Sequence, residues 1–343
     1  MRRINNDLYN FLIHNDIANT PQFNDANILQ WGNQNQNVIQ HYNSYLANIQ
    51  VGGESGPIEK HPYFDNHADD FDLSRKFLVL GTFPPSSYFN NLDLAGLPNP
   101  NIQNNNPFNY YYGNTADFWV FLFGEIPEDI DDLKHQLLQN GVSISDVFKY
   151  IQRKKMNNAA DNNLYNIVLN CDVKRIFSND SKISTLLFTS GNLSKLLNNQ
   201  PSALAGFRWI LEDCMGGLLN FEISGSFNGD GPYYPINNEG LNNAEIQQNG
   251  GIVWWLKNKD KKIRIINLPS PSRNSFRQDP RTSFYFKYIH YMALLYNVPP
   301  PQNNQNLRNY TDQHFQIFTN TPSLKYRNVV YQKVLNDTLN EIL

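Results

Sequence analysis

The 343-residue sequence has few charged side chains, few cysteines and no long run of apolar residues. Charged residues make up 17% of the chain, and Cys171 and Cys214 are its two cysteines. Two cysteines do not build the multi-disulfide framework of a small secreted domain, so we expect reduced thiols and a cytoplasmic protein. The lack of an apolar run of about 20 residues argues against a transmembrane helix. The first residues also lack the apolar core of a secretory signal.

Asparagine and aromatic residues are abundant instead. Asn occupies about 50 positions, whereas Leu, Ala and Gly lead an average composition. Aromatic residues make up 13% of the chain, which argues against wholesale disorder because large apolar groups offset the entropy cost of ordering. The length suits one large α/β domain or two medium ones.

The net charge of −3 hides an uneven distribution. Residues 1–70 hold three basic and eight acidic side chains, whereas residues 257–281 hold eight basic and two acidic ones. Because salt screens charges beyond about 8 Å, a polyanion responds to the local charge, and the mean charge does not exclude DNA as a partner. A solvated basic face is the alternative interpretation of this stretch.

Short apolar runs alternate with amphipathic segments, which predicts an α/β fold with a mostly parallel sheet covered on both faces. Residues 1–58 are predicted to form an acidic, Asn/Gln-rich helical extension, 59–298 the main domain and 299–343 a C-terminal extension. Strands are predicted at 76–80, 142–147, 173–177 and 263–268, and helices at 118–123, 129–139, 164–170, 183–197, 252–256, 283–295 and 326–343.

Two predicted strand ends continue into unusual loops, GTFPP at 81–85 and LPSPSRNS at 268–275. In open α/β sheets, ligands bind beyond the carboxyl ends of the strands. Serine hydroxyls and arginines suit phosphate oxygens, although an ordinary turn that caps the next helix has the same composition. The aromatic segment 110–119 suits the stacking of a flat ring, or equally a core cluster with Asp117 as a helix N-cap.

Several short motifs follow one another in order along residues 59–295. They are EKHP at 59–62, GTFPP at 81–85, YYGN and DFW within 111–119, GVSISDV at 141–147, NAAD at 158–161, KRIF at 174–177 and LPSPS at 268–272. Together they resemble the uracil-DNA glycosylase superfamily, and its hypoxanthine- and mismatch-type branches in particular. The resemblance implies a three-layer α/β/α sandwich with a short, mostly parallel central sheet.

The resemblance also implies an activity. Such enzymes flip a base out of DNA and hydrolyse its N-glycosidic bond, because the reacting atoms are otherwise inside the base stack. No cofactor and no metal are expected, and the partner is DNA rather than a membrane. The base is expected to be uracil, hypoxanthine, a mismatched base or a hypermodified phage pyrimidine, the last in phage defence, since long loops at 86–109 and 224–250 flank the expected site.

The resemblance assigns residues one by one. Many relatives hold the attacking water with Asn or Asp two residues after the motif glycine, but this chain has Phe83 there. We therefore expect Asp117 to activate the water, with Asn114 assisting, and Asp146 to be structural. The base-binding set is predicted to be Thr82, Phe83, Tyr112, Phe118 and Asn179, and the DNA-binding set Ser270, Ser272, Arg273, Asn274 and Arg277.

Two other functional classes stay open. Phe83 favours a non-catalytic DNA reader that keeps a degenerate glycosylase fold. A small-molecule hydrolase or a structural protein on a similar sheet is the third possibility, and its binding would be insensitive to salt. A helix-capping role is an alternative for Asn179.

Overall fold

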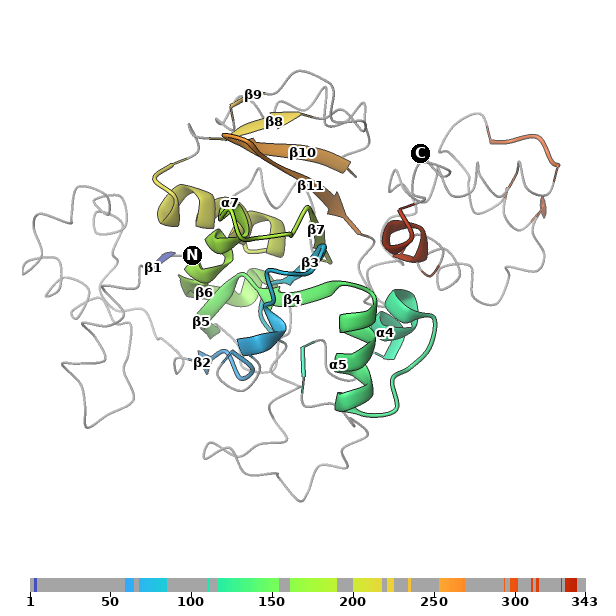
Figure 1. Cartoon of the computed structure of the whole chain (residues 1–343), viewed down its shortest axis with the longest axis horizontal. Coiled ribbons are helices and arrows are strands. Elements are labelled where there is room, and N and C mark those ends of the chain that lie inside the picture. The colour runs from blue at the N-terminus through green and yellow to red at the C-terminus, as the bar shows by residue number, and fades with distance from the viewer. Residues whose placement is uncertain are drawn as a thin grey trace, which may run out of the picture.

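A computed structural model of the whole chain shows the fold (Figure 1). The structure describes residues 3–4, 59–64, 68–84, 110–111, 116–153, 161–189, 200–217, 221–224, 234–235, 253–268, 293, 297–301, 310, 313–314, 328 and 331–337.

A mixed seven-stranded sheet lies at the centre of the described residues (Figure 1). In spatial order its strands are β4 (Val142–Asp146), β3 (Phe77–Gly81), β7 (Thr185–Phe188), β11 (Lys261–Asn267), β10 (Val253–Asn258), β8 (Glu222–Ser224) and β9 (Tyr234–Pro235). The pairs from β4 to β11 are parallel, and those from β11 to β9 are antiparallel. The expectation of an α/β fold with a mostly parallel sheet is confirmed for the five strands from β4 to β10.

The parallel strands are buried on both faces, which explains their continuous apolar sequences. Every residue of β3, FLVLG, is buried. Its side chains alternate between two cores: Phe77 and Val79 belong to one cluster, and Leu78 and Leu80 to the other.

Two helices cover the first face of the sheet. They are α4 (Ala116–Phe123) and α5 (Ile130–Gln139), which lie together in Figure 1. Tyr331 and Val334, near the C-terminus, are buried in the same cluster. The helix predicted at 129–139 is confirmed as α5: Asp129 caps it by accepting from the N–H groups of residues 131 and 132, and Gly141 follows it at a positive φ of 61°.

Helix α7 and a second sheet cover the other face. Helix α7 (Ala203–Cys214) packs there with the 3-10 helix η5 (Cys171–Phe177). The second sheet has the order β1 (Arg3–Ile4), β6 (Leu164–Leu169), β5 (Phe148–Arg153) and β2 (Glu59–Lys60). Two short 3-10 helices, η2 (Ala68–Asp70) and η4 (Asp161–Asn163), complete the elements.

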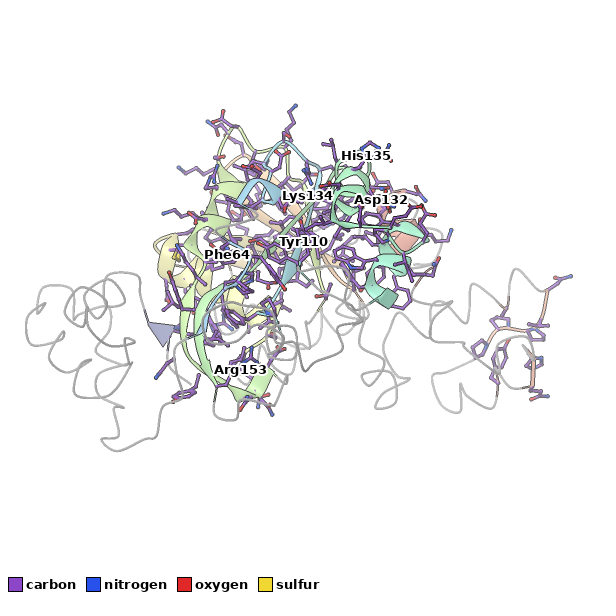
Figure 2. The ribbon with its side chains drawn as sticks, turned by 90° about the horizontal axis from the view of Figure 1, so that it is seen from below. Phe64, Tyr110, Asp132, Lys134, His135 and Arg153 are labelled. Atoms are coloured by element: carbon purple, nitrogen blue, oxygen red, sulfur yellow. A yellow bond between two sulfur atoms is a disulfide. The ribbon has the colours of Figure 1, made fainter. Side chains whose placement is uncertain are left out.

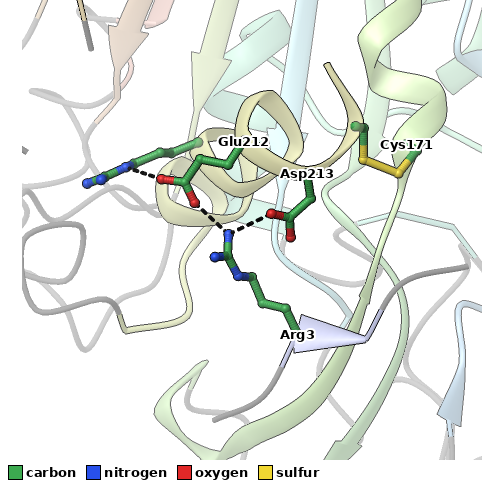
Figure 3. A network of polar contacts seen from close by, with 6 residues as sticks. Arg3, Cys171, Glu212 and Asp213 are labelled. Atoms are coloured by element: carbon green, nitrogen blue, oxygen red, sulfur yellow. Dashed lines mark hydrogen bonds and ion pairs between the residues drawn. A yellow bond between two sulfur atoms is a disulfide. The ribbon is translucent and has the colours of Figure 1, made fainter. Parts of the chain in front are cut away.

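The N-terminal strand is attached to this second layer. Strand β1 pairs in parallel with β6, and the Arg3 guanidinium contacts the carboxylates of Glu212 and Asp213 on α7 (Figure 3). Arg3 also lies over the Trp209 ring, 5.5 Å from its centroid. Of the predicted helical extension 1–58, the structure describes residues 3–4, which form a strand, and the other residues lie outside the described part of the chain.

Several predicted elements are wrong in type. Residues 173–177 were expected to be a strand but belong to η5, while 164–169 and 253–258 form strands instead of helices. Residues 185–188, placed in a predicted helix, form β7. Each error concerns a short apolar segment, in which the spacing of apolar residues alone does not distinguish a buried strand from a helix.

The expectation of two reduced thiols is also wrong. A disulfide joins Cys171 at the start of η5 to Cys214 at the end of α7. The two elements pack against each other in the second core, which brings these cysteines together across 43 residues of sequence. Within the described residues, no helix is both long and apolar enough to cross a membrane.

Candidate active site

Four residues form a row across the carboxyl ends of the parallel strands. Asp146 on β4 is in register with Gly81 on β3. Thr189 directly follows Phe188, which pairs with Leu80, and the N–H of Leu268 donates to the Phe188 carbonyl at 2.8 Å. We call Asp146, Gly81, Thr189 and Leu268 the carboxyl-edge row.

The row presents its side chains to the face that carries α4 and α5. Ile144 and Leu187 belong to the cluster on that face, and side chains two residues further along a strand point the same way. Gly81 lies between Asp146 and Thr189 and has no side chain. Two strand spacings of about 4.8 Å put the backbones of Asp146 and Thr189 roughly 9.5 Å apart, with only backbone between them.

The strand order makes this edge a candidate ligand site. After β3 the chain forms β4 on one side and then returns to form β7 on the other. Such a reversal is a topological switch point, where open α/β sheets bind their ligands beyond the carboxyl ends. The GTF turn at 81–83 begins at this point, and the LPSPS loop begins two strands away at the same edge.

A buried histidine holds the carboxylate of Asp146. His61 Nε2 lies 2.9 Å from Asp146 Oδ2, and the side chains are 0% and 6% exposed. The backbone N–H of Tyr63 donates to His61 Nδ1 at 3.2 Å, so Nδ1 is the acceptor and the ring proton is on Nε2. Burial lowers the pKa of His61, although the hydrogen bond and the charge of Asp146 oppose this shift. His61 is thus a neutral donor to Asp146.

Aromatic rings surround this pair. Phe64 stacks on His61 with centroids 3.7 Å apart, while Phe83 meets it edge-on at 5.2 Å. The Tyr111 ring is 5.3 Å from His61. Burial, followed by the charges of Asp146 and Asp70, raises the pKa of Tyr111 well above its usual value, so this phenol stays protonated at neutral pH. Figure 2 shows Phe64 and Tyr110 near the centre of the molecule in that view.

One oxygen of Asp146 remains available. His61 occupies Oδ2, and the Asn170 amide donates to the backbone carbonyl of Asp146 at 2.9 Å. Among the described residues, no donor bonds to Oδ1. The carboxylate therefore has a fixed orientation and one oxygen that can accept a proton or hold a water molecule.

Two of the predicted site residues, Thr82 and Phe83, lie next to the row, and a third, Phe118, lies in the core cluster on the same face of the sheet. Thr82 and Phe83 are both 7% exposed and directly follow β3. The Arg153 side chain donates to the Pro84 carbonyl at 2.8 Å, which fixes the turn from the second layer. Phe118 is fully buried, edge-on to Trp119 at 4.8 Å and near Tyr331, which favours a core role for its ring.

The principal predicted catalytic residue lies on the same face. The Asp117 backbone is in the first turn of α4, inside the helix rather than at its N-cap. Two residues later, the Trp119 ring is 6.2 Å from Tyr110, which contacts Tyr111 and Tyr63. The start of helix α4 is therefore connected to the His61–Asp146 pair through the aromatic rings of Tyr110 and Tyr111.

Asn179 was predicted to follow a strand and read the base, and this placement is wrong. It is exposed in the turn after η5. Two nearby contacts fix this region at the amino ends of the strands: Lys182 N–H donates to Leu73, which precedes β3, and Lys261 at the start of β11 donates to the Ser181 carbonyl. Asn179 is thus at the edge opposite the carboxyl-edge row.

The remaining predicted residues lie outside the described part of the chain. These are Asn114, Tyr112, Ser270, Ser272, Arg273, Asn274 and Arg277.

In the described part of the basic stretch 257–281, three basic side chains contact other side chains of the protein. Lys257 pairs with Glu222 at 3.7 Å, Arg264 with Asp337 at 2.8 Å, and Lys262 lies over the Trp255 ring at 4.4 Å. These residues belong to the β10–β11 hairpin, whose turn at 259–260 is at the amino end of β11. They therefore form a paired basic face away from the carboxyl-edge row.

Sequence reasoning missed the pairing of His61 with Asp146. The available signal was the position of Asp146 at the end of a predicted strand, the same criterion that singled out Gly81. The contact of His61 with it depends on tertiary structure, because 85 residues separate the two. In the part of the chain that the structure describes, no group of acidic, His or Cys side chains has the arrangement of a metal site.

Comparisons with protein-family models, with curated proteins and with solved structures find no match to this chain.

Proposed function

We propose that this protein is a monofunctional DNA glycosylase that flips a damaged or modified base and hydrolyses its N-glycosidic bond to leave an abasic site. One observation carries the proposal. The two motifs on which the family resemblance depends most, GTFPP and LPSPS, begin at the same edge of the sheet, and GTFPP begins beside the buried, oriented carboxylate of Asp146. Both motifs follow parallel strands, so one ligand bound at this edge of the sheet can contact both of them.

The site chemistry suits this reaction. The transition state resembles an oxocarbenium ion, so a nearby carboxylate stabilises the sugar and accepts a proton from the attacking water. Backbone N–H groups of the 82–83 turn and the serine loop at 270–274 would hold the base and the phosphates. By the resemblance, Asp117 and Asn114 hold the water, and Arg273 and Arg277 contact the backbone of the DNA.

The two covered faces of the sheet support a finer fold assignment. Helices α4 and α5 lie on one side, and α7 with the second sheet on the other. This arrangement supports a three-layer α/β/α sandwich in which one outer layer includes extra strands. The proposed location is the cytoplasm, and it rests on the proposed DNA substrate alone, because the Cys171–Cys214 disulfide removes the argument from reduced thiols.

The test is a panel of DNA substrates. Duplex and single-stranded oligonucleotides carrying uracil, hypoxanthine, mismatched bases or hypermodified pyrimidines are incubated with the protein and treated with alkali, which cleaves at abasic sites. Mass spectrometry then identifies the released base. We expect strand cleavage with at least one substrate together with release of the free base. Tight binding to DNA with no abasic sites on any substrate would refute the proposal.

Phe83 favours a second candidate function, in which the protein binds DNA without cleaving a glycosidic bond. Its buried ring stands where many relatives hold the water, and it packs against His61 instead of binding a polar ligand. If Asp117 holds the water, as the resemblance implies, Asp117→Ala removes turnover and keeps the affinity for DNA, whereas a reader binds DNA and has no turnover to lose. A protein that binds DNA with few charged side chains should also show an affinity that depends only modestly on the salt concentration.

A further inference from the structure

We propose that Asp146 is the residue that holds and deprotonates the attacking water, and that His61 is its positioning residue. This inference rests on the proposed glycosylase function. It differs from the assignment by resemblance, which gives the water to Asp117 and treats Asp146 as structural.

The position of Asp146 is the first argument. It ends β4 in register with Gly81, the glycine of the GTFPP motif. Because Gly81 has no side chain, the neighbouring position on this face of the sheet holds only backbone. A ligand bound above the motif turn would therefore meet the Asp146 carboxylate from the side, at the switch point of the sheet.

The hydrogen bonds of Asp146 are the second argument. Buried polar atoms are nearly always bonded, so an oxygen without a donor on a largely buried carboxylate can accept a hydrogen bond from a ligand or a water molecule. Asp146 gives Oδ2 to His61 at 2.9 Å, while no described residue donates to Oδ1. Its backbone is fixed separately by Asn170. The arrangement orients one oxygen and leaves the other for a water molecule.

His61 cannot itself be the base in this geometry. Its Nδ1 accepts from the Tyr63 N–H, and its Nε2 proton bonds to Asp146, so neither nitrogen is open to water. The stacked Phe64 and the edge-on Phe83 fix the plane of its ring. A locked neutral imidazole that donates to a carboxylate is a positioning group.

The proposed step balances without any other reactant. As the bond between C1′ and the base nitrogen breaks, its electron pair leaves with the base. The water oxygen bonds to C1′, and the water proton passes to Asp146 Oδ1. The departing base then takes a proton from solvent, and Asp146 releases its own. The products are the free base and an abasic deoxyribose.

The test compares single-turnover rates and DNA affinities of variants on the substrate found active. Asp146→Asn keeps an oxygen to accept from His61 but loses the negative charge. General-base catalysis contributes about 10²- to 10⁴-fold, so we expect the rate to fall by roughly that factor while the Kd for DNA changes little. Asp70→Asn is the matched control, because Asp70 is equally buried, at 4% exposure, but lies against Lys134 on α5.

Two substitutions of His61 test its role. Gln places an amide N–H where the imidazole has Nε2, whereas Leu has no donor. We expect His61→Leu to slow the single-turnover rate roughly 10- to 100-fold, since a small displacement of a catalytic group costs about that much. His61→Gln should restore most of the rate. A merely structural role would affect stability in both variants without this difference in rate.

The outcomes separate the inference from the proposed function. Normal turnover by Asp146→Asn overturns the inference and leaves the glycosylase intact. An inactive wild-type protein on all substrates overturns both. Should Asp146→Asn fail to fold, the His61 pair decides: rescue by Gln supports the inference, and equal rates for Gln and Leu refute it.

Discussion

Gly206 on α7 tests how tightly the second layer packs beneath the candidate site. A Cβ added at this position would lie 2.4 Å from Val147 Cγ2 and 2.6 Å from Phe148 Cε1. Carbon atoms in contact are ordinarily about 3.5–4.0 Å apart, so both approaches are short by about 1 Å. Both partners are fully buried and directly follow Asp146, so they have little room to move.

Two opposing terms set the size of the effect of Gly206→Ala. Alanine in a helix interior is favoured over glycine by about 1 kcal/mol. Forcing an extra methyl into a close-packed core costs about 1–3 kcal/mol, and the double clash points to the upper half of that range. We therefore expect the free energy of unfolding to fall by about 1–2 kcal/mol.

Urea unfolding, followed by tryptophan fluorescence and far-UV circular dichroism with the disulfide intact, measures this change. Val147→Ala removes the nearest clashing atom, so the double variant should be more stable than the sum of the single effects predicts, by about 0.5–3 kcal/mol. A Gly206→Ala protein as stable as the wild type, or more stable, would refute the packing argument, because helix propensity would then outweigh the clash.

Three further predictions concern stability. Reduction of the Cys171–Cys214 disulfide releases a loop of 43 residues and should lower the free energy of unfolding by up to about 4 kcal/mol; two reactive thiols in the unreduced, denatured protein would contradict it. Ser202→Ala removes the N-cap of α7, whose hydroxyl accepts from the Ala205 N–H at 3.1 Å, and should cost about 1 kcal/mol in urea unfolding. Burial lowers the pKa of His61 below 6.5, so below about pH 6.5 the unfolded chain binds a proton that the folded chain does not bind. The contribution of the neutral His61 to the free energy of unfolding is therefore fully present above about pH 6.5 and is lost as the pH falls. The melting temperature should decrease from pH 7.5 to 5.5, and it should decrease less steeply in His61→Gln.

The sequence predicts the elements whose signals are local. The run FLVLG and the capped helix from Asp129 to Asn140 are found where they were expected, because burial and capping are properties of adjacent residues. Segments 164–169 and 253–258 were mistaken for helices because their partners lie elsewhere in the chain. Strand β6 is held by β1 and β5, and β10 by β11 and β8, pairings that a local period does not reveal.

The candidate site shows the same division. The predicted strand ends at Gly81 and next to Leu268 are confirmed, since strand ends are local features of the sequence. The error at Asn179 followed from one wrong strand: moving it from residues 173–177 to 185–188 transfers Asn179 from the carboxyl edge to the amino edge. A single misplaced strand thus removes a residue from the site and puts Thr189 in the row instead.

The charge distribution acquires a different meaning once the strands are placed. The basic stretch was the main sequence argument that a chain of net charge −3 can bind DNA. In its first half, Lys257 and Arg264 are paired with the carboxylates of Glu222 and Asp337, and Lys262 lies over the Trp255 ring, so part of this charge is engaged within the protein at the hairpin. Phosphate binding at the carboxyl edge must then depend on few arginines and on many neutral hydrogen-bond donors. Since counterion release scales with the number of phosphates that cations neutralise, a shallow dependence of DNA affinity on salt is the consequence, and a steep one would locate the DNA on the hairpin face instead.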